Sequence, residues 1–255
     1  MSVVATRPLG KLERLAYERQ ARDLERWPAR SQEECEPDGY WWDEEAADRV
    51  VTFIEGYCRH HKGEWAGQPF LLSDWQKEIV RTVFGWRRPD GTRRFRTAYV
   101  EVPRKNGKTE LAAAVALYLL VADGEEGAEI YSAATKKDQA KIVHDAAVQM
   151  VRRSPELRRF VEVYRNNLSV PALNAKFEPL SSDSDTLDGL NPHAAILDEL
   201  HAHRDRHVRD VLLTGMGARR QPLEFIITTA GVYDPTSIGW EQHEYARSVL
   251  EGVFE

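Results

Sequence analysis

The segment from Tyr99 to Leu120, YVEVPRKNGKTELAAAVALYLL, constrains the fold of this 255-residue chain more than any other segment. Its pattern predicts a strand over residues 97–102 and a helix over residues 108–121, joined by a short polar loop. A Gly-Lys-Thr triplet stands where the loop meets the helix. A strand, a loop and a helix in this order predict a site for a nucleoside triphosphate.

Each residue of the triplet has a role in such a site. Gly107 lets the backbone approach a phosphate without a side chain in the way. The N–H groups of the loop and the helix dipole attract the anion. Lys108 would contact the β and γ phosphates, and the Thr109 hydroxyl would ligate Mg²⁺. The match to G-x-x-x-x-G-K-[ST] is incomplete because Val102 occupies the first glycine position, and the triplet alone also fits a helix start with a solvated lysine.

Two acids follow a second buried run, HAAILDELHAH, at residues 193–203. Residues 194–197 predict a strand, and a carboxylate at the carboxyl end of a parallel strand lies in the ligand crevice of an open α/β sheet. Asp198 could hold Mg²⁺ through water, and Glu199 could polarise the water that attacks a γ-phosphate. Alone, both acids could simply cap a following helix. Together with Lys108 they supply what triphosphate hydrolysis needs, so we predict a Mg-dependent ATP hydrolase.

Strands and helices alternate along the remainder of the chain. We predict a helix over residues 135–153, capped by Thr135, and further strands over residues 128–133, 168–170, 175–180 and 223–229. Strands separated by helices indicate an α/β fold with a mainly parallel central sheet and helices on both faces.

The first third of the chain is predicted to be helical. Apolar residues recur at helical spacing between Leu12 and Leu24, before Pro28. Asp43 and Ser73 stand where helix N-caps are expected. We therefore expect three regions: a helical N-terminal region packed on the core over residues 1–66, an ATPase core over residues 67–232, and a helical linker over residues 233–255.

Two more segments hold candidate site residues. Trp75 and Gln76 follow Ser73; a Gln amide can pair with both the donor and the acceptor edge of adenine, and an aromatic neighbour can pack on the base. The buried run IITTAG ends in Thr228 and Thr229, whose hydroxyls could sense the γ-phosphate. A core Trp beside a surface Gln, and an ordinary strand end, also explain these residues.

Histidines beside the acids raise a competing prediction, a zinc hydrolase site. His203 and His207 are four residues apart and could share one helix face, as metal ligands do. The sequence lacks the H-E-x-x-H spacing and a third ligand set. A solvated or hydrogen-bonded histidine cluster is therefore favoured.

Composition sets weaker bounds. The formal net charge of -6 argues mildly against a DNA-binding protein unless positive charge is local. Basic residues concentrate between Arg81 and Lys108, around a predicted hairpin turn at Asp90 and Gly91. Arg152, Arg153, Arg158 and Arg159 form a second basic group.

No stretch approaches the roughly 20 apolar residues that a membrane span needs, and the N-terminus lacks the apolar core of a signal peptide. We therefore expect a soluble, intracellular protein with no membrane partner. Cys35 and Cys58 are too few and too far apart for a zinc knuckle or a disulfide framework, so we expect free thiols.

Five motifs, in order along the chain, resemble those of the large terminase subunits of tailed phages, in the group that includes the HK97-like packaging motors. The set covers about residues 68–231 and is specific to terminases rather than kinases; the missing first glycine is normal in this family. The motifs are WQ at 75–76, VPRKNGKT at 102–109, SAATKKDQA at 132–140, DGLNPHAAILDELH at 188–201 and TTAG at 228–231.

The resemblance implies a P-loop NTPase of the ASCE, RecA-like type, with Glu199 on the strand next to the phosphate-loop strand. It assigns Glu199, Lys108 and Arg104 to catalysis and Thr109 and Asp198 to Mg²⁺. It makes Thr228 and Thr229 the coupling motif. The ATP-binding residues it implies are Trp75, Gln76, Arg104, Lys105, Asn106, Gly107, Lys108 and Thr109.

The resemblance also implies partners: double-stranded DNA, further copies of the chain in a ring, the portal protein and the small terminase subunit. The location is then the host cytoplasm, with transient docking on the procapsid portal. A neighbouring subunit is expected to supply an arginine. Some relatives carry it before the glycine that aligns with Gly189, where this chain has Asp188, so Arg158, Arg159 and Arg165 remain candidates.

Large terminases usually continue into an RNase H-like nuclease domain, so we expect this chain to be the ATPase domain, with nuclease activity only in an absent C-terminal domain. Two alternatives remain. A superfamily 2-type helicase or translocase also has a Gln motif, a phosphate loop and Asp-Glu, but it needs a second RecA-like domain. A non-motor nucleotide-binding switch would not need a base such as Glu199.

Overall fold

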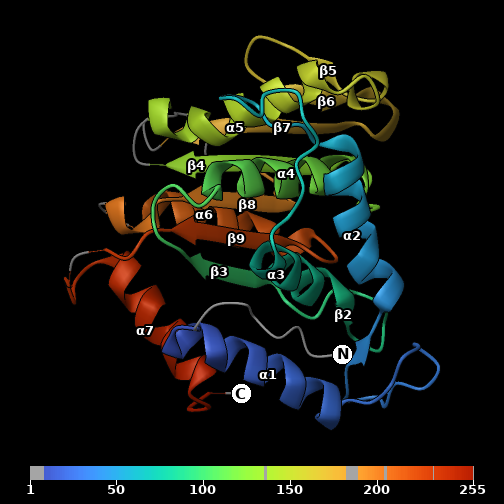
Figure 1. The fold of residues 1–255 in the computed structure, drawn as a ribbon, viewed down its shortest axis with the longest axis vertical. Coiled ribbons are helices and arrows are strands. Elements are labelled where there is room, and N and C mark those ends of the chain that lie inside the picture. Colours follow the sequence, from blue (N-terminus) through green and yellow to red (C-terminus); the bar gives the residue numbers. More distant parts are fainter. Residues whose placement is uncertain (1–8, 135–136, 182–188, 204–205, 232, 255) are drawn as a thin grey trace.

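The computed structural model describes residues 9–134, 137–181, 189–203, 206–231 and 233–254 (Figure 1). A seven-stranded sheet of order β3-β9-β8-β4-β7-β6-β5 forms its centre, and a two-stranded antiparallel ribbon, β1-β2, stands apart. The strands are β1 Trp41–Trp42, β2 Trp86–Arg87, β3 Thr97–Glu101, β4 Glu129–Ala134, β5 Glu162–Val163, β6 Leu168–Val170, β7 Ala175–Ser181, β8 Ala194–Asp198 and β9 Leu223–Thr228.

The sheet is mainly parallel, as predicted. β3, β9, β8, β4 and β7 pair in parallel, whereas β6 and β5 add an antiparallel edge. The carboxyl ends of the parallel strands therefore meet at one edge of the sheet, on the left of Figure 1. The short strand β5 and the ribbon β1-β2 were not predicted.

One expectation about strand order is wrong. Glu199 was expected on the strand next to the phosphate-loop strand, but β9 lies between β3 and β8 and pairs with both. The insertion brings the end of β9, with Thr228 and Thr229, between the phosphate loop and the acids. The hydroxyls of the expected coupling motif therefore lie in the site itself.

Helices cover both faces of this sheet. Alternate residues of β8 contribute to the cores on opposite faces of the sheet. Ala194 and Ile196 belong to the core that contains residues of α2 to α5, while Ala195 and Leu197 belong to a second core with α6. This alternation follows from the two-residue period of a strand. The helices are α1 Lys11–Arg26, α2 Glu44–Tyr57, α3 Asp74–Gly85, α4 Lys108–Val121, α5 Lys137–Arg153, α6 His207–Gly215 and α7 Ile238–Leu250, with short 3₁₀ turns η1 Leu157–Arg159, η2 Pro171–Leu173, η3 Leu200–Ala202 and η4 Met216–Ala218.

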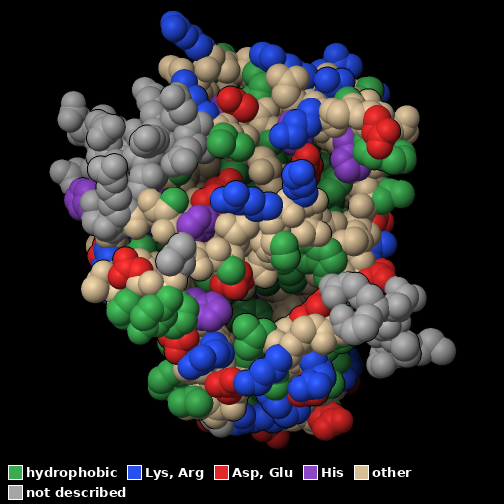
Figure 2. Space-filling model, turned by 60° about the vertical axis from the view of Figure 1, so that its left-hand side comes forward, with side chains coloured by type: hydrophobic (Ala, Val, Ile, Leu, Met, Phe, Trp, Pro, Cys, Tyr) green, Lys and Arg blue, Asp and Glu red, His purple; other side chains and the backbone are tan. Residues whose placement is uncertain are grey.

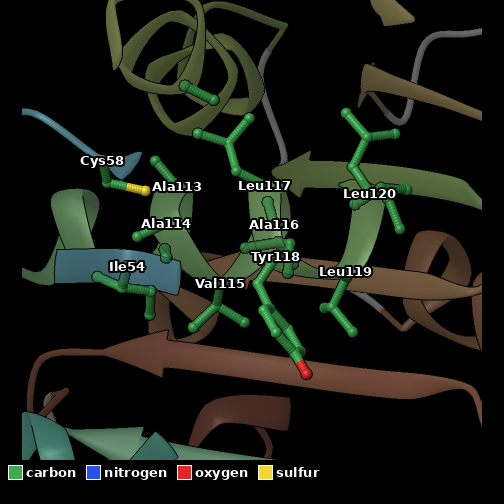
Figure 3. Close-up of a cluster of buried hydrophobic side chains, with 14 of the residues drawn as sticks. Ile54, Cys58, Ala113, Ala114, Val115, Ala116, Leu117, Tyr118, Leu119 and Leu120 are labelled. Atoms are coloured by element: carbon green, nitrogen blue, oxygen red, sulfur yellow. The ribbon is translucent and has the colours of Figure 1, made fainter. Parts of the chain in front are cut away.

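Helix α4 is the centre of the larger core. Every residue from Leu111 to Leu120 is buried, in accord with a sequence that is apolar on all sides. Figure 3 shows Ile54 of α2, and Cys58 directly after it, beside Ala113 and Ala114 of α4. A helix fixed on all sides gives the residues at its N-terminus a rigid support.

Local signals predicted several element ends. Asp43 precedes α2, and its side chain accepts a hydrogen bond from the Ala46 N–H at 2.9 Å. Ser73 precedes α3, and its N–H donates to Gln76 Oε1 at 2.9 Å. The predicted cap Thr135 lies outside the described residues.

The predicted C-terminal linker contains helix α7, which begins at Ile238 and packs against η3 and α1. An ion pair of Lys11 and Glu251 at 2.7 Å joins α1 to the residue that follows α7. The division into three regions stays a prediction.

The basic segment before the phosphate loop forms the predicted hairpin turn. The Arg88 N–H donates to the Thr92 carbonyl at 2.8 Å, and Gly91 has a φ of 79°. Much of its charge is internal, because Arg93 is fully buried and pairs with Asp123 at 2.9 Å. Arg81, Arg87 and Arg94 also pair with acids. These four arginines are therefore paired within the protein and are not free to contact phosphate.

No helix within the described ranges is both long enough and apolar enough to cross a membrane.

Candidate active site

The loop between β3 and α4 has the backbone of an anion-binding turn. Lys105 and Gly107 adopt the left-handed conformation, with φ of 66° and 71°. At position 107 a Cβ would stand 3.4 Å from Gln76 Nε2, so glycine is needed for its backbone conformation more than for space. Within the described chain, no backbone carbonyl accepts a hydrogen bond from the N–H groups of residues 107–110. These donors remain available to a ligand.

Lys108 opens α4 and points into the sheet edge. Its side chain is only 8% exposed, and Nζ lies 3.4 Å from the Val102 carbonyl and 3.6 Å from Glu199 Oε1. An ammonium group has three donors. With one long hydrogen bond and one long ion pair, it can still donate to further anionic oxygens, such as those of a phosphate.

Asp198 ends β8 and carries a buried oxygen, Oδ1, with no hydrogen-bond partner among the described residues. Burial, together with the neighbouring Glu199 carboxylate, raises the pKa of this carboxyl from 3.8 to about 6, against the opposing effect of Lys108. An unsatisfied buried carboxylate oxygen is what a cation site contains. The residue fits a role as a Mg²⁺ ligand.

Glu199 follows in a left-handed conformation with φ of 51°. Its Oε2 accepts hydrogen bonds from the Thr229 N–H at 3.1 Å and the Thr229 hydroxyl at 3.0 Å. Burial alone would raise the pKa of Glu199, but these two hydrogen bonds, together with Lys108 and His201, hold it below the ordinary value. Glu199 therefore ionises at a lower pH than the neighbouring Asp198.

The described residues contain no group of three or more His, Cys, Asp or Glu side chains that could hold a metal. A cation at Asp198 would take its other ligands from Thr109, phosphate oxygens and water, which is how Mg²⁺ is usually held. The zinc prediction fails on geometry, because His203 ends η3 and His207 starts α6, so the two share no helix face.

Thr228 and Thr229 both lie in the site, and they bring in a histidine that the motif analysis missed. The Thr228 hydroxyl lies 2.9 Å from His201 Nδ1, which is also 3.3 Å from Glu199 Oε2. The signal in the sequence was only a histidine two residues after Glu199. Its contact with Thr228 spans 27 positions and depends on β9 lying beside β8.

Gln76 and Trp75 lie at the start of α3. Gln76 is 5% exposed and its Nε2 lies 3.4 Å from the place where a Cβ of residue 107 would stand, but its Oε1 already accepts from Ser73. In this conformation only the donor side of the amide remains for a base. Trp75 packs against the main core and is partly buried. Their roles in adenine binding stay predictions.

The remaining loop residues Arg104, Lys105 and Asn106 are exposed beside the site. Figure 2, which brings the carboxyl edge of the sheet forward, shows basic, acidic and histidine side chains close together on this face. The structure thus brings together Lys108, Asp198, Glu199 and the two threonines, Thr228 and Thr229.

The candidates for the arginine that acts on a neighbouring subunit lie away from this site. Arg158, Arg159 and Arg165 are exposed in and after η1, near the antiparallel edge of the sheet. Position 188 lies outside the described residues.

Comparisons with known proteins agree with this geometry. A family profile described as "Terminase large subunit, ATPase domain" matches residues 74–248. The large terminase subunit of Enterobacteria phage HK97 is 34% identical over 193 residues, which is 73% of this chain and 37% of that protein. The crystal structure of the HK97 large terminase superposes with a TM-score of 0.69 and 30% identity, covering 80% of this chain and 41% of the other. The chain thus spans well under half the length of these relatives.

Proposed function

Because this chain belongs to the family of terminase large-subunit ATPase domains, we propose that it hydrolyses ATP to drive double-stranded DNA into a phage procapsid. The observation that carries the proposal is the meeting of Lys108, Asp198 and Glu199 at the carboxyl edge of one sheet, with Lys108 Nζ 3.6 Å from Glu199 Oε1. The family match also favours this function over a helicase or a nucleotide switch.

In the proposed reaction, water attacks the γ-phosphate of ATP, the bond to the β-phosphate oxygen breaks, and ADP leaves. Lys108 neutralises charge on the β and γ phosphates, with Arg104 near the γ-phosphate. Glu199 takes up the proton of the attacking water through Oε1, the oxygen that has no anchoring hydrogen bond. Because its pKa is held below the ordinary value, Glu199 is ionised at neutral pH, which is the form that can accept a proton.

A Mg²⁺ ion is proposed at Thr109 and Asp198, where it would neutralise phosphate charge. Asp198 would be ionised when it binds the cation, even though burial raises its pKa to about 6 in the structure. The backbone of residues 104–107 would cradle the phosphates. Gln76 and Trp75 would contact the adenine, with the Gln76 amide N–H as the donor.

Thr228 and Thr229 are proposed as the coupling residues. Thr229 binds Glu199 Oε2 directly, so a change at the γ-phosphate that moves Glu199 would move the end of β9. In turn β9 pairs along its length with both β3 and β8. A displacement at this point would therefore reach the centre of the sheet.

The proposed partners are double-stranded DNA, further copies of the chain in a ring, the portal protein and the small terminase subunit. The proposed location is the host cytoplasm, with docking on the procapsid portal.

For contact with DNA we propose the exposed arginines at the end of α5 and in η1. Blue side chains gather along the top edge of Figure 2, which holds these elements. Arg152, Arg153, Arg158 and Arg159 are exposed there, and the structure gives them no ion pair within the described residues. Nuclease activity in a further C-terminal domain stays a prediction.

The test of the proposed function is Glu199→Gln in a purified chain supplied with ATP and Mg²⁺. The amide keeps the shape of the side chain but cannot accept a proton. We expect ATP binding within a few-fold of wild type and a loss of turnover of about 10²-fold or more.

The matched control is Glu178→Gln, which removes a carboxylate of the same sheet that is 31% exposed, against 36% for Glu199. It should leave turnover unchanged. Equal turnover in Glu199→Gln and wild type would rule out the proposed base.

A further inference from the structure

The two carboxylate oxygens of Glu199 have different surroundings. Oε2 faces three donor groups: the Thr229 N–H at 3.1 Å, the Thr229 hydroxyl at 3.0 Å and His201 Nδ1 at 3.3 Å. Oε1 faces only Lys108 Nζ, at 3.6 Å. One oxygen is thus held in place, while the other is left for the water that reacts.

The neighbours of His201 Nδ1 favour one tautomer of the imidazole. The Thr228 hydroxyl has a single proton, which it donates to the Thr229 carbonyl at 3.1 Å. The same hydroxyl oxygen lies 2.9 Å from His201 Nδ1. The tautomer with a proton on Nδ1 suits this arrangement, because Nδ1 then donates to the Thr228 hydroxyl and presents the same N–H to the Glu199 carboxylate, 3.3 Å away.

The histidine itself is closely confined. A Cβ at Gly231 would stand 2.9 Å from His201 Cβ, and a Cβ at Gly239 would stand 2.7 Å from His201 Cα. Real Cβ atoms essentially never come this close to another atom, so the backbone at both glycines lies in direct contact with His201. Gly239 belongs to the first turn of α7, far along the chain from the acids.

Glu199 needs such support. A non-glycine residue in the left-handed region costs roughly 1–2 kcal/mol, so the conformation persists only where its surroundings fix it. The three donors on Oε2 come from two elements, η3 and the end of β9. They join the conformation of the acid to the position of the neighbouring strand.

We propose that His201 is a positioning residue for Glu199: its Nδ1–H anchors Oε2, and the first turn of α7 holds the imidazole in place. The inference rests on the proposed ATP hydrolysis and deepens it. His201 does not touch the reacting atoms. It keeps Oε1 directed toward the attacking water. Because the first turn of α7 packs against His201, the orientation of Glu199 depends on the position of α7.

The experiment compares steady-state ATP hydrolysis of the 255-residue chain with that of His201→Ala and His201→Asn. Loss of one polar contact to a charged group, with the two Thr229 donors remaining, should lower kcat about tenfold. KM for ATP should stay within about twofold, since a residue that orients the base does not bind the substrate. The Asn side chain can donate from nearly the position of Nδ1, so His201→Asn should recover most of kcat.

The control is His243→Ala, which removes another imidazole of the same region whose Nδ1 contacts Glu101 at 2.9 Å and not Glu199. It should leave kcat unchanged. Gly239→Ala should lower kcat as His201→Ala does, and the double variant should show no additional loss, because both changes act through the same contact.

A second measurement does not depend on the variants. The ¹⁵N spectrum of the His201 imidazole in the unmodified chain should show a proton on Nδ1, and an unprotonated Nδ1 would overturn the inference. Turnover in the unmodified chain combined with an unchanged kcat in His201→Ala would overturn the positioning role and leave the proposed function standing. Absence of turnover in the unmodified chain would overturn both.

Discussion

Replacing Asp198 by Asn should stabilise the protein in the absence of nucleotide and metal. Burial raises the pKa of Asp198 from 3.8 to about 6, and Oδ1 has no partner within the described chain. A shift of about 2 pKa units corresponds to about 3 kcal/mol. At pH 8 the ionised side chain therefore costs the folded state up to about 3 kcal/mol, and Asn does not carry this cost.

The sign follows from linkage. A folded-state pKa above the unfolded value means that the folded protein binds a proton more tightly, so this contribution to stability is present at low pH and is lost as pH rises through about 6. The free energy of unfolding of Asp198→Asn should therefore exceed that of wild type, and the excess should be about 1.4 kcal/mol larger at pH 8 than at pH 5.

The assay is urea denaturation at several pH values without Mg²⁺ or ATP. The control is Asp38→Asn, which changes an exposed aspartate in a turn and should give no excess that depends on pH. Addition of Mg²⁺ and an ATP analogue should stabilise wild type much more than Asp198→Asn, since the variant lacks the metal ligand. A variant less stable than wild type at pH 8, or an excess that does not change with pH, would refute the reasoning.

Two further changes test the phosphate site and the fold beneath it. Lys108→Met should lower affinity for ATP by at least about tenfold while the chain remains folded, because a nearly buried ammonium is removed from an anion site; nucleotide titration measures this. Arg93→Met should lower the free energy of unfolding by about 3–5 kcal/mol, since the buried Asp123 carboxylate loses its guanidinium partner and is left with the His193 imidazole at 2.7 Å, and adding Asp123→Leu should recover much of the loss in thermal unfolding. No loss in either case would contradict the account.

Local signals were enough to find most of the site. Gly107, Lys108 and Thr109 are contiguous, and the acids follow directly on a buried strand, so short stretches of sequence contain the information. Parallel strands end at a common edge, which made it possible to expect Asp198 near Lys108 although 90 positions separate them. Apolar runs and caps such as Asp43 gave the helices for the same reason.

Features that depend on strand order could not be predicted in this way. No local pattern shows that β9 pairs with both β3 and β8, and so the contact of Thr229 with Glu199 was missed. His201 gains its role only from that contact. Likewise, the sequence showed only that arginines concentrate before the phosphate loop. The burial of Arg93 depends on its pairing with Asp123, which follows α4 and lies 30 positions away.

The most direct test of the central claim is a crystal structure of the chain with Mg²⁺ and a non-hydrolysable ATP analogue. The account predicts the γ-phosphate between Lys108 Nζ and Glu199 Oε1, with the metal at Thr109 and Asp198. Nucleotide bound at another edge of the sheet, or Glu199 and Lys108 on opposite sides of the bound phosphates, would contradict it.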